Sequence, residues 1–586
     1  MKLADALVQT LRDWEVQYVF GVSGANIEHL HDAIHRHGQG KLISVLAKTE
    51  TGAAFMADCR ARVHKRLAVC CATAGGGMLN LAVGIAESYA EAVPVLAIVG
   101  QPPTSLEGRG AFQDSSGIGN CVDAVQLWRA ISKYVGKIRT PHDFWPMLRD
   151  AVVAATSGRQ GPAVLLVPRD LYDREVGPPP PDWPGDLPGF CRSRPIGIGE
   201  VMPLLEAIRS ARRPLLLIGQ GARRSDDAGA VEAFARTTGI PVVTTMSARG
   251  DFPNDDRLYL GTIGAAGHPS AHAYLRDEAD LIIAAGATLD VMTRSAVERS
   301  FKDKRFAVVD VDPEAIHRIL QPEITLYADV GRAFRALLEL LERTPMSPLP
   351  PVEGYSRSLY EPRLAPAIPG DAPGAGRADA LLQSQALAIL EAYLPTKGHV
   401  VLDAGNCAAA AMHYLSVPPG STSTIALGMG GMGYAIAGAI GAQLGSEPGT
   451  RTTVICGDGA FLMLGLEVHT AVDLSLPVLF VVFNNAMHGM CVTRQQLLFE
   501  SRIEAVRYPG VDFATLARGL APESRLWVGA ASTPEELRER LREYHESYPL
   551  LPGVLELRLE REEIPPFAPF LGPDAPTMPV SAFGAL

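Results

Sequence analysis

Short apolar runs alternate with amphipathic stretches along most of the chain. In the first third, the runs at 16–20, 67–73 and 93–100 read VQYVF, LAVCCAT and VPVLAIVG. Continuous apolar runs are typical of strands buried on both faces of a sheet, and the amphipathic stretches between them are typical of crossover helices. The pattern therefore predicts an α/β fold built on parallel sheets.

Two stretches rich in Pro and Gly divide this pattern. Residues 177–189 read GPPPPDWPGDLPG, and 346–377 have a similar composition, so neither fits a helix or a central strand. We interpret both as linkers, and the proline-rich residues after about 563 as a surface tail or a partly disordered end. Three blocks remain, each expected to form a doubly wound parallel-sheet domain: 1–172, 196–345 and 378–565.

The composition narrows the class of protein. The 586 residues carry a formal net charge of −11, with 47% hydrophobic and 20% charged residues, as in an ordinary globular protein. The acidic balance argues against nucleic acid or an anionic membrane as the main partner. No apolar run reaches the roughly 18 residues of a membrane helix, and charges interrupt the N-terminus, where a signal peptide needs an apolar core. The eight cysteines form no CxxC pair, which favours reduced core residues in a cytoplasmic protein.

Two polar turns in block three carry the strongest chemical signal. The run TTVICGDG ends at Gly457-Asp458-Gly459, and LPVLFVVFNN ends at Asn484-Asn485. Ligands of open α/β sheets bind at the carboxyl ends of strands, so both turns are expected to face one crevice. Asp458 offers a carboxylate and Asn485 an amide oxygen, and Mg²⁺ accepts both beside phosphate oxygens. A lone GDG turn more often only ends a strand, and the second turn makes the pair informative.

This arrangement resembles the cofactor motif of thiamine-diphosphate enzymes, in which GDG on one strand is followed by NN on the next. The resemblance implies that Asp458, Asn485 and the main-chain carbonyl of Met487 hold Mg²⁺, and that the metal binds the cofactor's diphosphate. The motif therefore predicts thiamine diphosphate and Mg²⁺ as cofactors.

The segment 426–442, ALGMGGMGYAIAGAIGA, resembles a glycine-rich segment of the acetolactate synthases. By that resemblance Met432 bends the cofactor into a V shape, and the carbonyl of Gly430 accepts a hydrogen bond from its aminopyrimidine. Taken alone, the segment would equally fit a packing helix of small residues. Its place just before the GDG strand favours the cofactor role.

Block one carries the other half of the resemblance. LAKTETGAAFMA at 46–57 is similar to the family segment RHEQGAAHMA, and Glu50 stands at the position of its glutamate. A glutamate at a helix start often serves only the helix dipole. The resemblance instead implies a carboxyl that exchanges a proton with N1′ of the aminopyrimidine, and we expect it to be buried. GRGAFQD at 108–114 further implies that Phe112 and Gln113 line the site near the reacting carbon.

The residues that the resemblance places at the cofactor are turn glycines and their neighbours. Glycine at such turns lets the backbone approach a diphosphate closely. The full set is Gly24, Gly75, Asn80, Gly405, Asn406, Gly428, Gly430, Met432, Gly457, Asp458, Gly459, Ala460, Asn485, Met487, His488, Gly489 and Met490.

Several positions depart from the acetolactate synthase pattern. After the paired asparagines, NNAMHGMCVTRQQ places Arg494 where the family has a tryptophan that limits acceptor size, and His488 where leucine is common. Arg494 therefore either faces a charged substrate or is an ordinary exposed helix residue. Thr104-Ser105 replace an arginine-bearing stretch of the family, and Ser115-Ser116 stand where simple pyruvate decarboxylases carry adjacent histidines.

Block two resembles the central domain of this family, which in acetolactate synthases holds FAD that plays no redox part. The stretches GQGARRS, YLGTIGAAGHPSA, GATLDVMTRS and VVDVDP carry the resemblance. The alternative is a central domain that binds nothing, as in many decarboxylases. The residues expected near a flavin are Gly219, Gly221, Arg223, Gly286, Arg294, Asp310 and Asp312.

The resemblance as a whole predicts decarboxylation of a 2-keto acid, most simply pyruvate, and carboligation to a second carbonyl. Alternatives on the same scaffold are an acetyl-transferring carboligase with a ketone or keto-sugar acceptor, and a 2-keto acid decarboxylase or oxidase. A non-catalytic homologue is disfavoured because Glu50, Asp458 and Asn485 are intact. In the family the site forms between block one of one subunit and block three of another, so we expect a homodimer or a homotetramer.

Overall fold

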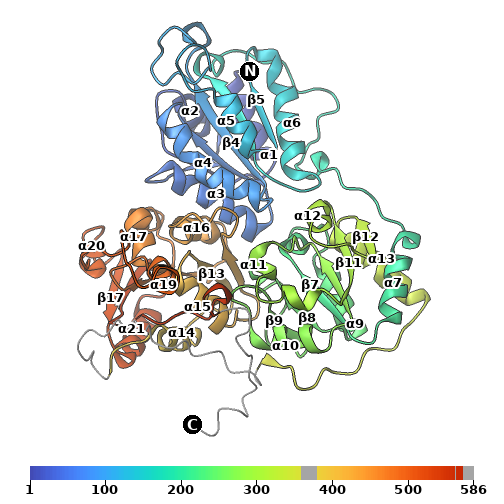
Figure 1. Ribbon diagram of the computed structural model, residues 1–586. Helices are drawn as coiled ribbons and strands as arrows, with labels where there is room; N and C mark the ends of the chain where they lie inside the picture. Colours follow the sequence, from blue (N-terminus) through green and yellow to red (C-terminus); the bar gives the residue numbers. More distant parts are fainter. Residues whose placement is uncertain (358–378, 561, 572–586) are drawn as a thin grey trace. The chain divides into compact units, whose positions relative to one another are not determined.

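The computed structural model describes residues 1–357, 379–560 and 562–571 (Figure 1). The chain packs into two compact units. Unit 1 contains Met1–Arg192, Ala426–Pro448 and Met463–Leu476, and unit 2 contains the described residues of Ser193–Ile425, Gly449–Leu462 and Pro477–Leu586. The predicted linker at 346–377 lies partly outside the described residues, as does the predicted tail from 572 onward.

Unit 1 is built on a sheet of six parallel strands in the order β2-β1-β3-β4-β6-β5. The order reverses between β1 and β3, and in open α/β sheets such a reversal marks the ligand crevice. The strands are β1 (Tyr18–Gly21), β2 (Ile43–Leu46), β3 (Ala68–Ala72), β4 (Val95–Gln101), β5 (Tyr134–Lys137) and β6 (Ala163–Pro168).

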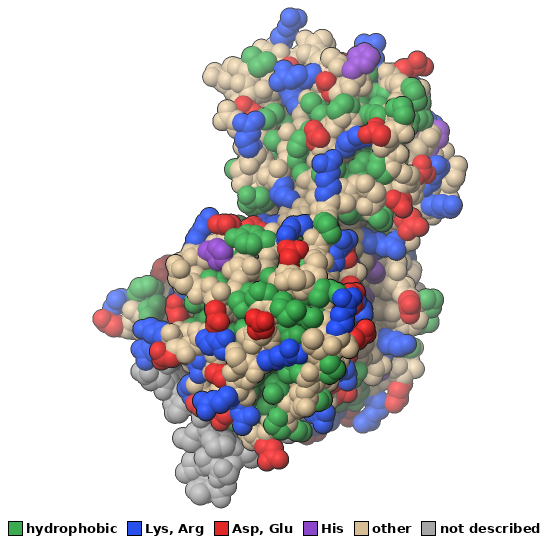
Figure 2. Space-filling model, turned by 90° about the vertical axis from the view of Figure 1, so that its right-hand side faces the viewer, with side chains coloured by type: hydrophobic (Ala, Val, Ile, Leu, Met, Phe, Trp, Pro, Cys, Tyr) green, Lys and Arg blue, Asp and Glu red, His purple; other side chains and the backbone are tan. Residues whose placement is uncertain are grey.

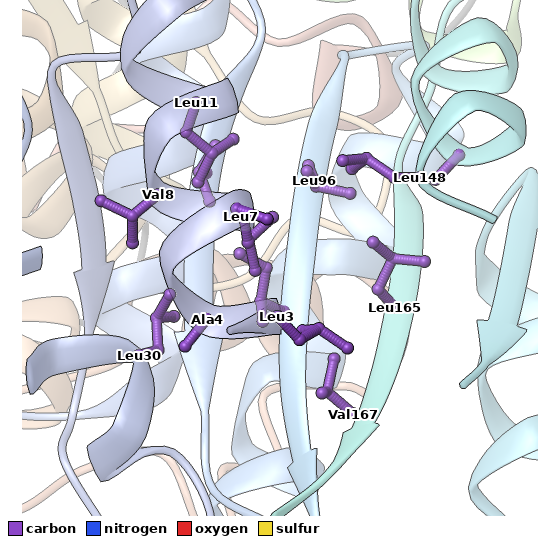
Figure 3. Close-up of a cluster of buried hydrophobic side chains, with 14 of the residues drawn as sticks. Leu3, Ala4, Leu7, Val8, Leu11, Leu30, Leu96, Leu148, Leu165 and Val167 are labelled. Atoms are coloured by element: carbon purple, nitrogen blue, oxygen red, sulfur yellow. The ribbon is translucent and has the colours of Figure 1, made fainter. Parts of the chain in front are cut away.

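Helices α1 (Leu3–Asp13), α2 (Glu28–His37) and α6 (Phe144–Thr156) share one hydrophobic core with this sheet. On α1, Leu3, Leu7 and Leu11 recur every fourth residue, so they form one face, and all three are buried. Figure 3 shows this face over Leu96 and Leu165 of the sheet. Helices α3 (Glu50–His64) and α4 (Gly76–Ala90) pack on each other and against β3 and β4, and α5 (Ala124–Ile131) completes the unit's larger helices from this part of the chain.

Two segments of block three belong to unit 1, and they include α16 (Tyr434–Gln443) and α18 (Val468–Asp473). Helix α16 lies along α3. Its small residues permit this close approach, because a Cβ at Gly441 would overlap the carbonyl oxygen of Met56, and one at Gly438 would lie 3.0 Å from Cβ of Cys59. The packing therefore gives this Gly- and Ala-rich helix a structural reason for its composition.

The first sheet of unit 2 has six parallel strands in the order β12-β11-β10-β7-β8-β9, which reverses between β10 and β7. Its strands are β7 (Pro214–Ile218), β8 (Val242–Thr244), β9 (Tyr259–Thr262), β10 (Leu281–Ala285), β11 (Arg305–Asp310) and β12 (Ile324–Tyr327). The helices of this region are α7 (Ile198–Ser210), α8 (Gln220–Arg223), α9 (Gly229–Thr238), α10 (Pro269–Asp277), α11 (Val291–Arg294), α12 (Glu314–His317) and α13 (Val330–Arg343).

The second sheet of unit 2 runs β14-β13-β15-β16-β18-β17, again with all strands parallel, and it reverses between β13 and β15. Its strands are β13 (Gly398–Leu402), β14 (Thr422–Ile425), β15 (Arg451–Gly457), β16 (Val478–Asn484), β17 (Trp527–Ala531) and β18 (Gly553–Arg558). The helices are α14 (Gln383–Glu391), α15 (Asn406–Tyr414), α17 (Asp458–Leu464), which ends in unit 1, α19 (Gly489–Leu498), α20 (Phe513–Arg518), α21 (Pro534–Ser547) and α22 (Ala568–Leu571).

The predicted α/β class, with three parallel sheets, is confirmed. The boundaries of the three predicted domains stay predictions. The two compact units divide the chain differently, because two segments of block three belong to unit 1. The expected surface tail is wrong for its first residues, because Glu563, Ile564 and Phe567 are buried. Among the described residues, no helix is long and apolar enough to cross a membrane. On the face shown in Figure 2, acidic and basic side chains are interspersed.

Candidate cofactor site

The carboxylate of Asp458 follows the carboxyl end of β15 and is 2% exposed. Its Oδ1 accepts a hydrogen bond from the main-chain N–H of Gly459 at 2.8 Å. Its Oδ2 accepts from the N–H of Ala486 at 2.7 Å and from that of Asn485 at 3.1 Å. Because β15 and β16 are neighbours, these bonds join the turns at their ends. The structure thus brings the Gly-Asp-Gly and Asn-Asn turns together.

No arginine or lysine pairs with Asp458 in the part of the chain that the structure describes. Burial raises the pKa of this carboxyl, because desolvation disfavours its charged form more than its hydrogen bonds favour it. The described residues contain no group of three His, Cys, Asp or Glu side chains that could hold a metal by themselves. One carboxylate, an amide oxygen, a main-chain carbonyl and diphosphate oxygens form the hard oxygen set that Mg²⁺ prefers. The residues present fit a Mg²⁺-diphosphate group, in which the Mg²⁺ ion would be the cationic partner of Asp458.

Glu562 is a residue at this site that the sequence analysis missed. Its Oε1 accepts a hydrogen bond from Nδ2 of Asn406 at 2.7 Å, and its Oε2 accepts from Nδ2 of Asn485 at 2.5 Å. Burial raises the pKa of Glu562 to about 7, against the opposing effect of these two amides. The position of Glu562 shortly after β18, near the carboxyl edge of the sheet, could have indicated a role at the site. The proline-rich stretch that follows it suggested a tail instead.

The other predicted residues of unit 2 surround these groups. The N–H of Met487 donates to Oδ1 of Asn485 at 3.2 Å, and the ring of His488 meets that of Tyr508 at 5.5 Å. Gly489 begins α19, and a Cβ there would lie 2.8 Å from Oε1 of Glu562. Arg494 lies exposed on the same helix. The remaining predicted positions are in the adjoining turns and helix starts: Gly405 before α15, Gly457, Gly459 and Ala460 at the start of α17, and Met490 on α19.

In unit 1, Glu50 is the first residue of α3. The side chain of Thr49 caps this helix by accepting a hydrogen bond from the N–H of Gly52 at 2.9 Å. Oε2 of Glu50 accepts from Nδ2 of Asn80 at 3.0 Å, and a Cβ at Gly77 would lie 2.9 Å from its Oε1. Glu50 is half-buried, so the expectation of full burial is wrong for this chain by itself. Its position at the helix start leaves part of the carboxyl open to solvent.

Three further predicted residues gather at the carboxyl ends of β1 and β3. A Cβ at Gly24 would lie 2.8 Å from Cβ of Thr73, and one at Gly75 would lie 2.9 Å from Cβ of Gln113. Gly75 also has a φ of +64°, which favours glycine. Phe112, the neighbour of Gln113, is 81% exposed. These glycines therefore permit close packing of two turns.

The loop before α16 is held by Glu87 of α4, another residue that the sequence analysis did not single out. Its Oε1 accepts a hydrogen bond from the N–H of Gly428 at 3.2 Å, and its Oε2 accepts from those of Met429 at 2.6 Å and Gly430 at 3.3 Å. Glu87 is fully buried. One carboxylate thereby orders the loop that leads to Met432, the predicted wedge of the cofactor.

Arg62 supplies the positive charge for this buried cluster. Its guanidinium lies 2.6 Å from Asp58, 3.1 Å from Glu87 and 3.4 Å from Glu91, measured between nitrogen and oxygen. The hydroxyl of Tyr434 donates to Asp58 at 2.7 Å. Burial would lower the pKa of Arg62, but the surrounding carboxylates outweigh it and hold the pKa well above its ordinary value. The cluster is buried within unit 1, and one arginine is shared by its three carboxylates.

A second buried carboxylate orders the turn before Glu50. Oε1 of Glu467 accepts hydrogen bonds from the main-chain N–H of Lys48 at 2.9 Å and of Thr49 at 3.0 Å, and its Oε2 accepts from the hydroxyl of Thr470. Glu467 is 1% exposed, and burial raises its pKa. Block one therefore holds a block-three loop through Glu87, and block three holds a block-one turn through Glu467.

The residues predicted near a flavin lie along the first sheet of unit 2. Gly219 follows β7 and Gly286 follows β10, where the strand order reverses, and the N–H of Gly221 donates to the carbonyl of Gly286 at 2.9 Å. Asp310 ends β11 and accepts from the N–H of Asp312 at 2.8 Å. The two arginines already have protein partners. Arg223 is paired with Asp251, and Arg294 with Glu298.

Thr104, which departs from the acetolactate synthase pattern, and Ser115, which stands where simple pyruvate decarboxylases carry a histidine, have structural partners as well. The hydroxyl of Thr104 donates to Asp170 at 2.7 Å, at the exposed end of β4. The hydroxyl of Ser115 is buried and donates to Oε1 of Gln101 at 2.8 Å. Both residues therefore contribute to the local packing of unit 1.

Family comparisons agree with this division of the chain. The N-terminal thiamine pyrophosphate binding domain matches residues 1–119, the central domain of thiamine pyrophosphate enzymes matches 201–337, and the C-terminal thiamine pyrophosphate binding domain matches 403–551. Each match contains one of the cofactor-site or central-domain regions described above.

Relatives match nearly the whole chain. The acetolactate synthase large subunit of Corynebacterium glutamicum is 32% identical over 540 residues, which are 88% of this chain and 81% of the relative. The probable acetolactate synthase large subunit of Methanocaldococcus jannaschii is 29% identical over 97% of this chain and 94% of its own length. Acetolactate synthase 1 of Oryza sativa subsp. japonica is 30% identical over 88% of this chain and 79% of its own length. The chain therefore belongs to the thiamine pyrophosphate enzymes, in the group of the acetolactate synthase large subunits, and thiamine diphosphate is its cofactor.

Proposed function

We propose that this chain decarboxylates a 2-keto acid, most simply pyruvate, and joins the remaining acyl unit to a second carbonyl. The observation that carries the proposal is the buried Asp458 at the reversal point of the sheet, bonded to the Asn-Asn turn and lacking a protein cation among the described residues. Similarity to acetolactate synthase large subunits supports the reaction class.

Asp458, Asn485 and the carbonyl of Met487 would hold Mg²⁺ through hard oxygens, and the metal would bind the diphosphate. Bound thiamine diphosphate supplies the electron sink that takes up the electron pair left when CO₂ departs. The buried setting of Asp458 keeps water away from the charged groups, which strengthens their attraction.

Glu50 is the proposed proton carrier. Asn80 donates to its Oε2 and thereby orients the carboxyl, which leaves Oε1 free to exchange a proton with the aminopyrimidine. Gly77 leaves room for this oxygen beside α4.

Glu50→Gln tests this role. CO₂ release from pyruvate with thiamine diphosphate and Mg²⁺ should fall by about 10²–10⁴-fold, as for loss of a positioned acid-base group. Glu28→Gln is a matched control, because Glu28 is also the first residue of a helix but is exposed. The proposal is wrong if Glu50→Gln retains parental activity, or if the parent releases no CO₂ from any 2-keto acid.

The acceptor separates the carboligase alternatives. Arg494 is exposed on α19, the helix that begins at the predicted cofactor residue Gly489. A fixed cation there suits an anionic acceptor, either a second keto acid or an acidic keto-sugar. Mass spectrometry of products from pyruvate alone, and from pyruvate with candidate ketones, distinguishes these outcomes and also detects simple aldehyde or acetate formation. With an anionic acceptor other than pyruvate, Arg494→Gln should raise KM for that acceptor and leave KM for pyruvate as the donor unchanged.

We also propose a homodimer or homotetramer in which Glu50 of one subunit and Asp458 of another form one site. Glu50→Gln and Asp458→Asn subunits, each inactive alone, can be unfolded and refolded together. A shared site predicts that the mixture regains about a quarter of parental activity, since half of the dimers are mixed and each mixed dimer has one intact site. Recovery of none would place both residues in the site of a single chain.

We also propose that the central domain binds FAD and that the protein is located in the cytoplasm. Gly219, Gly221 and Gly286 lie at the strand-order reversal, where dinucleotides bind in such sheets, and this supports a flavin in the central domain. The flavin spectrum of the purified protein tests it, and a colourless protein with an unchanged fold would favour a central domain that binds nothing. None of the eight cysteines, which all lie in the described residues, forms a disulfide, and this supports a reducing compartment.

A further inference from the structure

The segment after β18 returns to the second sheet of unit 2 and buries two consecutive carboxylates. Glu562 is 7% exposed and contacts Asn406 and Asn485, whereas Glu563 is 8% exposed and accepts hydrogen bonds from the N–H of Ser384 at 2.7 Å and from its hydroxyl at 2.9 Å. Glu563 therefore fastens the segment to the start of α14, while Glu562 points to the predicted metal site.

The chemistry of Glu562 determines which way both amides face. Both oxygens of Glu562 accept hydrogen bonds, so each amide presents its NH₂ group to the carboxyl. Oδ1 of Asn485 is then turned away from Glu562 and accepts from the N–H of Met487. Oδ1 is the atom that a magnesium ion would bind.

The other amide shows the same orientation. Nδ2 of Asn406 donates to Glu562 at 2.7 Å and to the hydroxyl of Thr493 at 3.1 Å. Thr493 in turn donates to the carbonyl of Gly489 at 3.0 Å. Both hydrogens of the amide are thus used, and its Oδ1 is buried with no hydrogen-bond partner among the described residues. A buried acceptor without a partner is costly, so it indicates a group that is yet to bind.

The packing around Glu562 supports a fixed geometry. A Cβ at Gly489 would lie 2.8 Å from its Oε1, 3.1 Å from Nδ2 of Asn485 and 3.3 Å from Nδ2 of Asn406. A side chain at this position would therefore displace all three groups. The first residue of α19 is glycine in a place where the amides and the carboxylate need its space.

We propose that Glu562 is a positioning residue that orients the amide oxygens of Asn485 and Asn406 towards the metal and its ligands. The inference rests on the proposed function, because the amide oxygens are oriented to bind Mg²⁺ and thiamine diphosphate. Groups that orient metal ligands in this way commonly change metal affinity by about 10–100-fold when they are altered. Glu562, which follows β18, is then part of the metal site.

Glu562→Gln is the direct test, and Glu563→Gln is its matched control on the neighbouring residue. Glutamine at 562 has one acceptor and one donor group, so one of the two asparagines must turn its oxygen away from the site. Glutamine at 563 can still accept from the N–H of Ser384, and the hydroxyl of Ser384 can turn to accept. Mn²⁺ is the probe, and its free concentration is followed by electron paramagnetic resonance while it is titrated into cofactor-free protein with excess thiamine diphosphate.

We expect the Mn²⁺ dissociation constant of Glu562→Gln to rise by about 10–100-fold, with that of Glu563→Gln within about twofold of the parent. Glu562→Asp keeps a carboxylate and should recover part of the loss, which a merely structural role would not predict. An unchanged constant for Glu562→Gln overturns the inference. A tighter constant also overturns it, since Glu562 would then compete with the ligand. If the parent itself fails to bind Mn²⁺ with thiamine diphosphate, the proposed function fails instead.

Discussion

The two halves of the proposed site use buried carboxylates in opposite ways. In unit 1, Asp58, Glu87 and Glu91 surround Arg62, so part of their negative charge is compensated inside the protein. In unit 2, Asp458 and Glu562 are also buried, but no arginine or lysine pairs with them among the described residues. The cluster in unit 1 orders a loop without a ligand, whereas the carboxylates in unit 2 have a place for a bound cation.

This difference explains what each half contributes. A carboxylate cluster with its own arginine is costly to break, because removing the cation leaves uncompensated buried charges. Buried carboxylates without a protein cation raise the free energy of the folded state until a dication binds, so binding and stability are linked. We expect unit 1 to present a preformed loop and unit 2 to gain order with the metal.

The largest expected effect is the loss of Arg62, the cation of the unit 1 cluster. Arg62→Met removes the charge that compensates Asp58 and Glu87 while keeping a long side chain. The free energy of unfolding should fall by about 3–5 kcal/mol, measured from the urea transition that reports on unit 1. Arg66→Met is the matched control, because its pair with Glu15 has side chains 61% and 75% exposed, and it should change stability by less than about 1 kcal/mol. Equal effects of the two variants would show that the cluster is not a special source of stability.

The next effect is that of a bound metal and diphosphate on the buried carboxylates Asp458 and Glu562. Mg²⁺ with inorganic pyrophosphate offers the metal and the diphosphate without the aminopyrimidine. At about 100 times its dissociation constant it should stabilise the protein by about 2.7 kcal/mol. Hydrogen exchange should slow at the N–H groups of Asn485 and Ala486, which bind Asp458, and stay unchanged at those of Met429 and Gly430, which bind Glu87. Slowing at both pairs of amides would contradict the view that the loop in unit 1 is preformed.

Glu87→Gln should have a smaller effect on the same loop. Both oxygens of Glu87 accept from N–H groups that cannot reverse, so a glutamine NH₂ must face at least one donor. The expected loss is about 1–3 kcal/mol in the free energy of unfolding, with faster hydrogen exchange at Gly428, Met429 and Gly430. A stable variant with unchanged exchange in this loop would show that Glu87 does not order it.

Glu467→Gln should have the smallest effect, below about 1 kcal/mol. A glutamine oxygen can still accept from the N–H of Lys48 and of Thr49, and the hydroxyl of Thr470 can turn to accept from the new NH₂. Because burial raises the pKa of Glu467, its contribution is most favourable below its unfolded pKa and is lost as pH rises through the folded one. The difference in unfolding free energy between variant and parent should therefore move in favour of the variant as pH rises from 4 to 8. A difference that stays constant over this range would contradict a raised pKa.

The sequence predicted the sheets and the two turns because both depend on local patterns. Buried parallel strands are continuous apolar runs, and the residues that follow them lie at one edge of the sheet. The order of runs and turns along the chain was therefore enough to pair Asp458 with Asn485. Glu50 was identified by resemblance, and its partial burial depends on packing that no local pattern reveals.

Glu87, Glu467 and Glu562 could not be predicted, because each acts on a segment far away in the chain. Glu87 and Glu467 lie on helical segments where a glutamate would ordinarily face water, and only the packing of block-three segments against block one buries them. Glu562 lies just before the proline-rich stretch that suggested a tail. The place of two block-three segments in unit 1 could not be predicted for the same reason, since contacts between distant segments decide it.

The interleaved build of unit 1 also sets the order in which the chain can mature during synthesis. Helix α3 packs against α16, so the first 192 residues leave the ribosome with the face of α3 around Met56 and Cys59 uncovered. That face stays open until α16 has been made, which ends at Gln443, and at about 5–20 residues per second this is a delay on the order of tens of seconds. A nascent chain that stalls within this interval would present an incomplete unit 1 to chaperones and proteases.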